Sequence, residues 1–392
     1  MNMDKSNWAN VYLGDVVHQI KDQVDAFNCG LKYYLGGEHF STDDLQANGR
    51  GEIADSTIGP AFIMRFKPGD VLLVSRNPHL RKMAVAGFEG ICSNVTYVLR
   101  ADTDKLLQEF LPFVVRSSGF WNFAMQNKRG STNFYLNWTD FEKYTLKLPP
   151  LDEQRRIAEL LWAAENSLEA HRNLLKDERD CLNVSITEVF RVIANNTLES
   201  FLNVGEWKSG GTPSRKVAEY WNGNIPWVSP KDMKTDHISD SIEKITDRAV
   251  ADGVSGAKLL PANTIIFVVR GMILAHTFPV AITDIPVAIN QDIKAILVGD
   301  DFDVRYIYYW LKYKSPHILS TAEESSHGTK RLATEVLGAL QIPKIPIASQ
   351  RKIVSKIDTI VKAIADTEKQ ITHTQKLITN LCNRFVGGIA DV

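Results

Sequence analysis

An internal duplication constrains the fold of this chain more than any other feature of its sequence. The segment Leu148–Ile157, LPPLDEQRRI, returns as Lys344–Ile353, KIPIASQRKI, with a shared proline and a shared Q-R-R/K-I core. The two segments occupy corresponding places in the two halves of a 392-residue chain. A sequence with this property predicts two copies of one scaffold rather than a single core.

A long heptad pattern follows each copy of this segment. A repeat of seven residues places one apolar stripe along a helix and favours a partner helix. At about 37 residues each, the helices would be about 55 Å long, and we expect them to pair with each other as an antiparallel coiled coil. The apolar positions are Leu161, Leu168, Leu175, Leu182 and Val189 in the first copy, and Ile357, Ile364, Ile371, Ile378 and Phe385 in the second.

The charges of these two segments favour their pairing. Residues 151–190 include five basic and nine acidic side chains, whereas residues 347–392 include seven basic and four acidic ones. Opposite net charges attract each other and select the partner. The intermediate heptad positions are mostly polar in the first copy, which would specify register at a cost in stability. Two separate amphipathic helices are the alternative.

Prolines divide the chain into segments. Leu148–Pro150 and Ile342–Pro346 cannot lie inside a helix, so each long helix begins sharply after its prolines. Ahead of each lead-in, short β-type runs alternate with turn signals. The sequence therefore predicts an α+β fold in which two similar mixed α/β domains are separated and joined by two long helices. The expected segments are 1–150 and 193–346 for the domains, and 151–192 and 347–392 for the helices.

The composition indicates a globular protein without a membrane span. Hydrophobic residues make up 44% and charged residues 23%. Apolar runs such as Thr264–Val269 are far shorter than the roughly 18 residues of a membrane helix, and the polar first residues predict no signal peptide. We expect a cytoplasmic protein. Its four cysteines lie far apart and predict simple thiols rather than a zinc module or disulfides.

The sequence contains no motif for catalysis. It has neither a G-x-G-x-x-G run nor a Walker motif. The segment Arg76–His79 lacks the second proline and the aromatic residue that amino-methyltransferases use to hold their target amine. The histidines have no H-x-H or H-E-x-x-H spacing, and Asp300–Asp303 is better interpreted as a solvated turn than as a cation site. We expect no catalytic residue, bound cofactor or metal ion.

The second half carries distinctive motifs that the first half lacks. Gly210–Ser214, GGTPS, precedes Tyr220–Trp227, YWNGNIPW, and the segment Ile289–Ala295 and the loop Gly328–Lys330 follow. Alone, the first two motifs could simply form a tight turn, an Asn/Gly hairpin and a packed tryptophan pair. Two copies of a scaffold with different loops indicate that each reads a different ligand.

Together with the duplication, these motifs resemble the specificity (S) subunits of type I restriction-modification systems over nearly the whole chain. The first half departs from the pattern with Tyr34–His39, YLGGEH, although similar openings occur in that family. The resemblance implies two target recognition domains, each reading one half of a bipartite asymmetric site in double-stranded DNA. It also implies that the helices set the half-site separation.

The resemblance further implies partners. Two modification (M) subunits would dock on the helices and supply S-adenosylmethionine and adenine methylation. Restriction (R) subunits would add translocation and cleavage with ATP and Mg. The chain itself would be non-catalytic and would bind no cofactor.

The residues expected to contact DNA lie in polar loops. Lysine, arginine and backbone N–H groups contact phosphates, and side chains that reach base edges read sequence. For any single residue, a solvated surface side chain is the alternative. The candidates are Arg76, Asn77, His79, Arg81, Lys82, Asn127, Lys128, Arg129, Ser131 and Asn133 in the first domain, and Thr212, Ser214, Arg215, Lys216, Lys231, Arg270, His276, His327, Lys330 and Arg331 in the second.

The overall charge limits this hypothesis. With a net charge of −1 the protein alone should bind DNA weakly, and much of the affinity should come from its partners.

Two other functions are possible from the sequence. The duplicated domains could bind proteins and act as an adaptor, or the chain could be a nuclease or methyltransferase with a divergent site.

Overall fold

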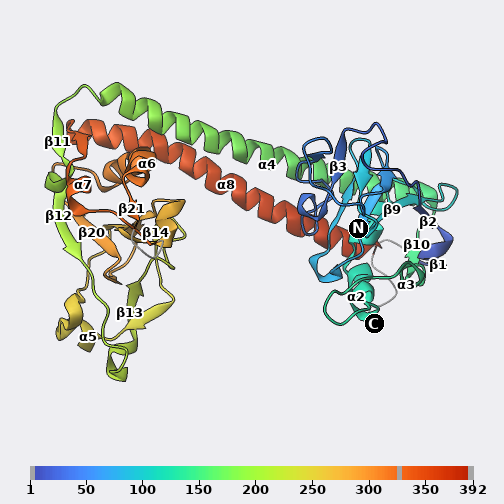
Figure 1. Cartoon of the computed structure of the whole chain (residues 1–392), viewed down its shortest axis with the longest axis horizontal. Helices are drawn as coiled ribbons and strands as arrows, with labels where there is room; N and C mark the ends of the chain where they lie inside the picture. Colours follow the sequence, from blue (N-terminus) through green and yellow to red (C-terminus); the bar gives the residue numbers. More distant parts are fainter. Residues whose placement is uncertain (1–4, 325–328, 387–392) are drawn as a thin grey trace. The chain divides into compact units, whose positions relative to one another are not determined.

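The computed structural model describes residues 5–324 and 329–386 (Figure 1). The chain divides into two compact units: unit 1 comprises residues 1–173 and 367–392, and unit 2 comprises residues 174–366. Two long helices, α4 (Leu151–Ile193) and α8 (Ile347–Val386), contribute to both units.

Unit 1 is built on two four-stranded sheets, ordered β2-β9-β6-β7 and β4-β3-β8-β5, beside the pair β1-β10. All four residues of β6 are buried, as expected for an interior strand covered on both faces. The strands are β1 (Ala9–Tyr12), β2 (Val17–Ile20), β3 (Tyr33–Leu35), β4 (Gly51–Glu52), β5 (Met64–Phe66), β6 (Val71–Val74), β7 (Met83–Val85), β8 (Gly90–Cys92), β9 (Thr96–Ala101) and β10 (Thr145–Leu148). The helices are α1 (Leu111–Arg116), α2 (Ser118–Gln126), α3 (Trp138–Phe141) and the short 3₁₀ helices η1 (Leu13–Asp15), η2 (Gly37–His39) and η3 (Pro78–Leu80).

Unit 2 contains a five-stranded sheet, β12-β20-β16-β18-β14, and two three-stranded sheets, β15-β13-β19 and β17-β22-β21, beside the pair β11-β23. The strands are β11 (Leu198–Ser200), β12 (Gly205–Ser209), β13 (Trp221–Val228), β14 (His237–Ile238), β15 (Glu243–Ile245), β16 (Ile265–Val268), β17 (Arg270–Gly271), β18 (Val280–Thr283), β19 (Ala288–Ile289), β20 (Ile293–Val298), β21 (Glu323–Glu324), β22 (Lys330–Arg331) and β23 (Gln341–Pro343). The helices are α5 (Asp247–Ala251), α6 (Val304–Ser320), α7 (Thr334–Gly338), η4 (Phe201–Val204), η5 (Ala218–Tyr220), η6 (Val254–Gly256) and η7 (Met272–Ala275).

The strand pairings of unit 1 recur in unit 2. The central strand β6 pairs antiparallel with β7 and β9, as β16 does with β18 and β20. The parallel pair β3-β8 corresponds to β13-β19, and the antiparallel pair β1-β10 to β11-β23. The predicted duplication of a mixed α/β scaffold is therefore confirmed.

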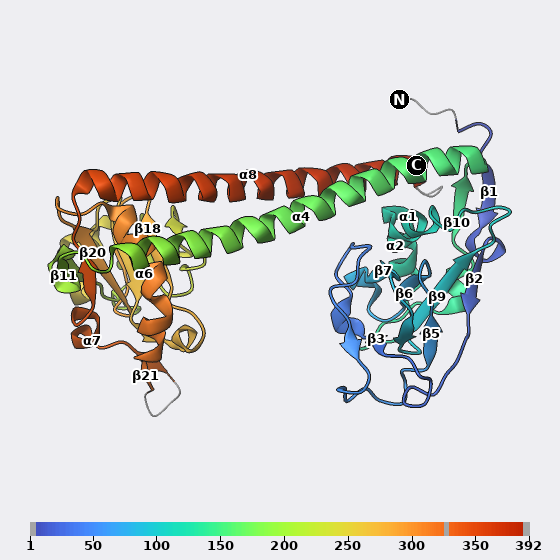
Figure 2. The same ribbon diagram turned by 90° about the horizontal axis from the view of Figure 1, so that it is seen from above.

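The two long helices pack together inside each unit (Figure 2). In unit 1, Leu161 and Leu168 of α4 share a core with Ile378 and Phe385 of α8. In unit 2, Phe190 of α4 shares a core with α8. The first half of α4 thus meets the second half of α8, which confirms the antiparallel pairing. At 43 and 40 residues the helices are longer than expected, about 65 and 60 Å.

The helix contact drifts along the predicted stripe. Leu175, Leu182, Val189, Ile364 and Ile371 are half-buried, whereas Leu161, Leu168, Ile357, Ile378 and Phe385 are buried. Near its end, α4 buries Ile186 and Phe190 on either side of Val189. A straight helix of 3.6 residues per turn moves gradually off a seven-residue repeat, so the contact passes to neighbouring positions.

The glutamine of the repeated motif fixes the start of each long helix. The amide of Gln154 donates to the carbonyls of Lys105 and Pro149, both at 2.8 Å, and its Oε1 accepts the N–H of Leu107 at 2.9 Å. Gln350 makes the corresponding three bonds to residues 301, 345 and 303. Both side chains are fully buried. Each glutamine therefore satisfies three backbone groups and ties its helix to a preceding loop.

The cysteines form no disulfide in the described part of the chain. Burial raises the pKa of the Cys92 thiol, and it raises that of Cys382 to about 12. Both thiols therefore stay protonated at neutral pH. Among the described helices, none is long and apolar enough to cross a membrane.

Candidate nucleic-acid interface

Two loops of unit 1 that are far apart in sequence form one small ribbon. The N–H of Leu136 donates to the carbonyl of Ser75 at 2.9 Å, and the N–H of Asn77 donates to the carbonyl of Phe134 at 2.8 Å. Tyr135 pairs antiparallel with Arg76 on one side and with Arg129 on the other. The segment after β6 and the glycine loop after α2 thus present a single surface, which we call ribbon 1 (residues 75–77, 129 and 134–136).

Unit 2 contains the same arrangement, formed by β17, β22 and β21. Arg331 lies between Arg270 and Glu323 in these antiparallel strands. The N–H of Leu332 donates to the carbonyl of Val269 at 2.9 Å, as that of Leu136 does to Ser75. We call this surface ribbon 2 (residues 269–271, 323–324 and 330–332). Arg76 therefore corresponds to Arg270, and Tyr135 to Arg331.

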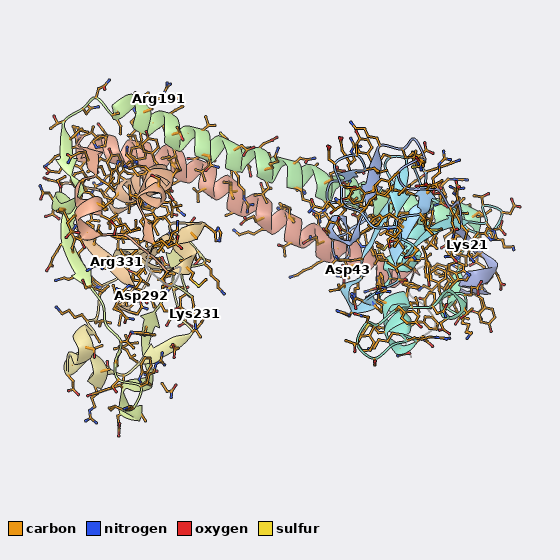
Figure 3. The ribbon with its side chains drawn as sticks, viewed as in Figure 1. Lys21, Asp43, Arg191, Lys231, Asp292 and Arg331 are labelled. Carbon is orange, nitrogen blue, oxygen red and sulfur yellow. The ribbon has the colours of Figure 1, made fainter. Side chains whose placement is uncertain are left out.

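A polar turn lies beside each ribbon. The N–H of Ser75 donates to the carbonyl of Val95 at 2.9 Å, and the N–H of Val269 donates to that of Asp292 at 2.8 Å. These contacts bring Ser93–Val95 next to ribbon 1 and Asn290–Asp292 next to ribbon 2. Figure 3 labels Arg331, Asp292 and Lys231 in unit 2. Lys231 follows β13, whose Val228 accepts the N–H of Asn290 at 2.9 Å.

The predicted basic residues fall into two groups. The first group makes no ion pair within residues 5–324 and 329–386, and it consists of Arg76, Lys128, Lys216, Lys231, Arg270, Lys330 and Arg331. The second group is already held by the protein. Arg81 pairs with Asp43 at 3.4 Å, Lys82 donates to the Gly37 carbonyl at 2.5 Å, Arg129 pairs with Asp140 at 2.6 Å and Arg215 pairs with Glu243.

Arg215 stabilises the motif at the start of unit 2. Its guanidinium carbon lies 3.7 Å from the centre of the Trp221 ring, and it forms a bidentate pair with Glu243. The hydrogen bond from Arg215 holds the pKa of Glu243 below its usual range. Trp227 donates to the Gly211 carbonyl at 2.9 Å, and its ring packs edge-on against Trp221. The tryptophan pair considered from the sequence is present, whereas the turn follows the glycines, where the N–H of Val217 donates to the Ser214 carbonyl at 3.2 Å. Arg215 therefore has a structural role.

The other predicted residues have mixed settings. Asn77 and Arg81 take left-handed backbone conformations at the ends of η3, and His79 is exposed between them. Asn127 donates to the Phe123 carbonyl at 2.9 Å at the end of α2. Ser131, Asn133, Ser214 and His276 are exposed, and Thr212 bonds to Gln291. His327 lies outside the described residues.

Sequence reasoning missed several residues at these surfaces. Tyr135 is 39% exposed in the middle of ribbon 1, and Met272 is 73% exposed directly after ribbon 2. Asn290 is buried and bonds to Asp292 at 3.1 Å. An alignment of the two halves at Leu136 and Leu332 would have placed Tyr135 opposite Arg331 and revealed the shared ribbon.

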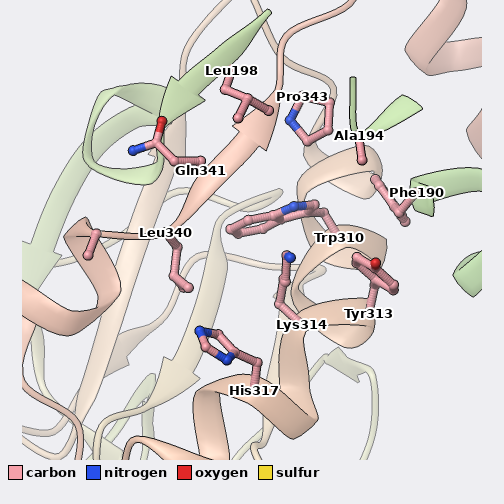
Figure 4. Close-up of a pocket in the computed structure, with 11 residues that line it drawn as sticks. Phe190, Ala194, Leu198, Trp310, Tyr313, Lys314, His317, Leu340, Gln341 and Pro343 are labelled. Atoms are coloured by element: carbon pink, nitrogen blue, oxygen red, sulfur yellow. The ribbon is translucent and has the colours of Figure 1, made fainter. Parts of the chain in front are cut away.

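A cavity of about 280 Å³ lies in unit 2 (Figure 4), and its described lining includes no residue of ribbon 2. Phe190, Trp310 and Tyr313 line it together with Lys314 and His317. Its walls come from α4, β11, α6 and β23, which supply none of the predicted DNA contacts. No group of three or more potential metal-binding side chains occurs among residues 5–324 and 329–386.

These features define a class of protein: a duplicated α+β chain with an arginine-bearing ribbon in each copy and two long helices that pair. The chain belongs to the family described as the type I restriction modification DNA specificity domain, because the model of that family matches residues 5–176 and 193–374. The resemblance seen in the sequence is thereby confirmed.

Two similar proteins are named specificity subunits of type I restriction enzymes. The chain is 37% identical over 167 residues to the type I restriction enzyme EcoR124I/EcoR124II specificity subunit of Escherichia coli, a match that covers 42% of this chain and 41% of that protein. It is 28% identical over 200 residues to the MjaIX specificity subunit of Methanocaldococcus jannaschii, covering 50% and 44%. The chain thus matches less than half the length of each of these two relatives.

Solved structures have the same fold over the whole chain. A chain from a structure that concerns complex assembly and conformational transition of the type I R-M system aligns with a TM-score of 0.62 and 20% identity, covering 97% of this chain and 98% of that one. The type I restriction-modification S subunit from M. genitalium aligns with a TM-score of 0.58 and 15% identity, covering 98% of both chains.

Proposed function

We propose that this chain is the specificity subunit of a type I restriction-modification complex and that it reads a bipartite asymmetric site in double-stranded DNA. Unit 1 would read one half-site through ribbon 1, and unit 2 the other through ribbon 2. The observation that carries the proposal is the cross-strand pairing of Arg270 with Arg331. Like charges placed opposite each other destabilise a sheet unless an anion neutralises them.

The unpaired cations supply the means of binding. Arg76, Lys231, Arg270, Lys330 and Arg331 can contact phosphates or guanine edges without breaking an ion pair of the described chain. Tyr135 adds an exposed aromatic ring between two arginines. The polar turns at Ser93–Val95 and Asn290–Asp292 provide further hydrogen-bonding groups for base edges. These turns differ between the units, which is consistent with different half-sites.

The paired helices would set the distance between half-sites. A helix about 60 Å long allows at most about 18 base pairs between domain centres at 3.4 Å per pair. Two M subunits would dock on the helices and bring S-adenosylmethionine, and R subunits would bring ATP and Mg. In this proposal the chain itself is non-catalytic, binds no cofactor and acts in the cytoplasm.

Genome-wide methylation mapping tests this function. The chain would be co-expressed with its M subunit in a host free of DNA methylation, and modified adenines would be read across the genome. We expect one bipartite motif with a fixed spacer, and an exchange of residues 1–150 for another such domain should change one half of it. A stable complex with the M subunit that methylates no motif would contradict DNA reading and favour the protein-binding adaptor.

A further inference from the structure

Met272 is an exposed apolar side chain next to the charged residues of ribbon 2. It is 73% exposed, and its neighbour Ile273 is 36% exposed. Both belong to η7, which begins directly after Arg270 and Gly271 of ribbon 2. Single exposed apolar residues are common on protein surfaces, so exposure alone has no functional meaning. The position of Met272 beside Arg270, Lys330 and Arg331 is what distinguishes it.

The local structure holds Met272 outward. Leu274 of the same 3₁₀ helix is 1% exposed and anchors the turn in the core of unit 2. The N–H of His276 closes the turn on the Ile273 carbonyl at 3.0 Å. Gly271 has φ of 152°, a conformation that side chains with a Cβ rarely adopt, and it turns the strand into η7. The short helix η7, anchored by Leu274, therefore holds the Met272 side chain at the surface.

Unit 1 shows that the scaffold does not require this exposure. The corresponding helix η3 begins with Pro78, which is buried, and continues with His79 and Leu80, the latter 36% exposed. Both units thus have an arginine before the 3₁₀ helix, but the first residue of the helix is buried in unit 1 and exposed in unit 2. The larger apolar surface is particular to unit 2.

We propose that Met272 enters the base stack of the half-site bound by unit 2 and partly unstacks one base step. This inference rests on the proposed function, because it takes double-stranded DNA as the ligand. Apolar wedges such as methionine act this way when flanking cations hold the phosphate backbone. Arg270, Lys330 and Arg331 are placed to hold that backbone beside the tip. Burial of Met272 between bases would offset part of the cost of unstacking.

The test uses the complex of the full chain with its M subunit and a duplex that carries the mapped motif. The adenine analogue 2-aminopurine, which fluoresces more when unstacked, replaces in turn each adenine on either strand of both half-sites. With the unaltered protein we expect a rise at one step in the half-site of unit 2, besides the rise at the methylated adenine. Met272→Ala should abolish the first rise, keep the second and weaken binding about tenfold.

Two further variants separate the wedge from other effects. Met272→Leu should retain the fluorescence rise, because it keeps an apolar tip. Leu259 is 47% exposed and precedes the start of β16, whereas ribbon 2 follows the end of that strand. Leu259→Ala should therefore change neither the fluorescence nor the affinity. Since methionine carries no charge, Met272→Ala should leave the salt dependence of binding unchanged, whereas Arg331→Ala should reduce its slope by about one.

The outcomes distinguish the wedge from the function on which it rests. Unchanged affinity and fluorescence in Met272→Ala, with weakened binding in Arg331→Ala, would overturn the wedge and leave DNA reading intact. If the complex methylates no motif and Arg331→Ala has no effect, DNA reading fails and the wedge fails with it.

Discussion

Arg270 and Arg331 are direct partners across the antiparallel strands β17 and β22. Neither guanidinium forms an ion pair in the described part of the chain, although Glu323 is the neighbour of Arg331 on the other strand. A repulsive pair at an exposed position costs the free protein stability. Binding of a polyanion would neutralise the two arginines and remove this repulsion.

Replacing one of these arginines should therefore have opposite effects on stability and on binding. Arg270→Thr should stabilise the free chain by about 0.2–1 kcal/mol, because it removes the repulsion and Arg270 has no acidic residue opposite it in the described strands. The same change should weaken DNA binding by the complex about 10- to 100-fold. Thermal unfolding and gel-shift titrations measure the two effects. Lys258→Thr, an exposed lysine ahead of β16, should change neither, and equal loss of binding in both variants would contradict the assignment of ribbon 2.

Gln350, the buried glutamine at the start of α8, should contribute strongly to the stability of the folded protein. Gln350→Leu leaves the Asp301 and Ile345 carbonyls and the Asp303 N–H without their partner. We expect destabilisation of about 3 kcal/mol, since each buried unsatisfied group costs about 1–3 kcal/mol. Urea unfolding measures this change.

An exposed glutamine on the same helix provides the matched control. Gln370→Leu should shift stability by less than about 0.5 kcal/mol. An equal shift in the two variants would show that the Gln350 hydrogen bonds contribute nothing specific to the helix start.

The sequence allowed the large features of the fold to be predicted, because their signals are periodic or repeated. The heptads and the Q-R-x-I motif identified both long helices and their pairing. The ribbons could not be predicted in the same way. Strands β17 and β22 have two residues each, which is too short for periodicity, and their partners lie about 60 positions apart in the chain.

The predicted contact residues show a second limit. Arg76 and Arg129 both come from polar loops, and the sequence predicts a DNA contact for each of them on the same grounds. Folding places Arg129 against Asp140 and leaves Arg76 unpaired in the described chain. Whether a cation is available to a ligand depends on tertiary neighbours, which single-sequence patterns do not contain. The same holds for Arg215, whose partner Glu243 lies on strand β15.

The paired glycines of the GGTPS motif are required by close packing. A Cβ on Gly211 would lie 1.8 Å from the Ser255 carbonyl oxygen, and one on Gly210 would lie 2.0 Å from that of Ile289. Because both obstacles are backbone atoms, Gly211→Ala should destabilise unit 2 by about 3 kcal/mol. Gly299→Ala meets its nearest atom at 3.6 Å and should be nearly neutral in the same urea titration. A neutral Gly211→Ala would mean that the backbone at Gly211 or at Ser255 can shift to make room.

The ion pair between Arg129 and Asp140 should make the stability of the protein depend on pH. This dependence distinguishes an arginine with a structural role from one that has no ion pair. The hydrogen bond from Arg129 is the largest cause that lowers the pKa of Asp140, and Lys143 adds to it. A carboxylate whose pKa is lowered by folding stabilises the protein above its unfolded pKa of about 3.9. That contribution is lost as the pH falls through the lowered folded value.

Arg129→Gln should therefore lower the urea midpoint at pH 7, and the difference from the unaltered protein should shrink below about pH 4. Arg129 is half exposed, so solvent screening keeps the effect small. Arg76→Gln is the matched control, because Arg76 has no ion pair in the described chain: its urea midpoint should follow that of the unaltered protein at every pH while DNA binding weakens. A pH-independent loss in Arg129→Gln would mean that the arginine acts through packing rather than through the charge of Asp140.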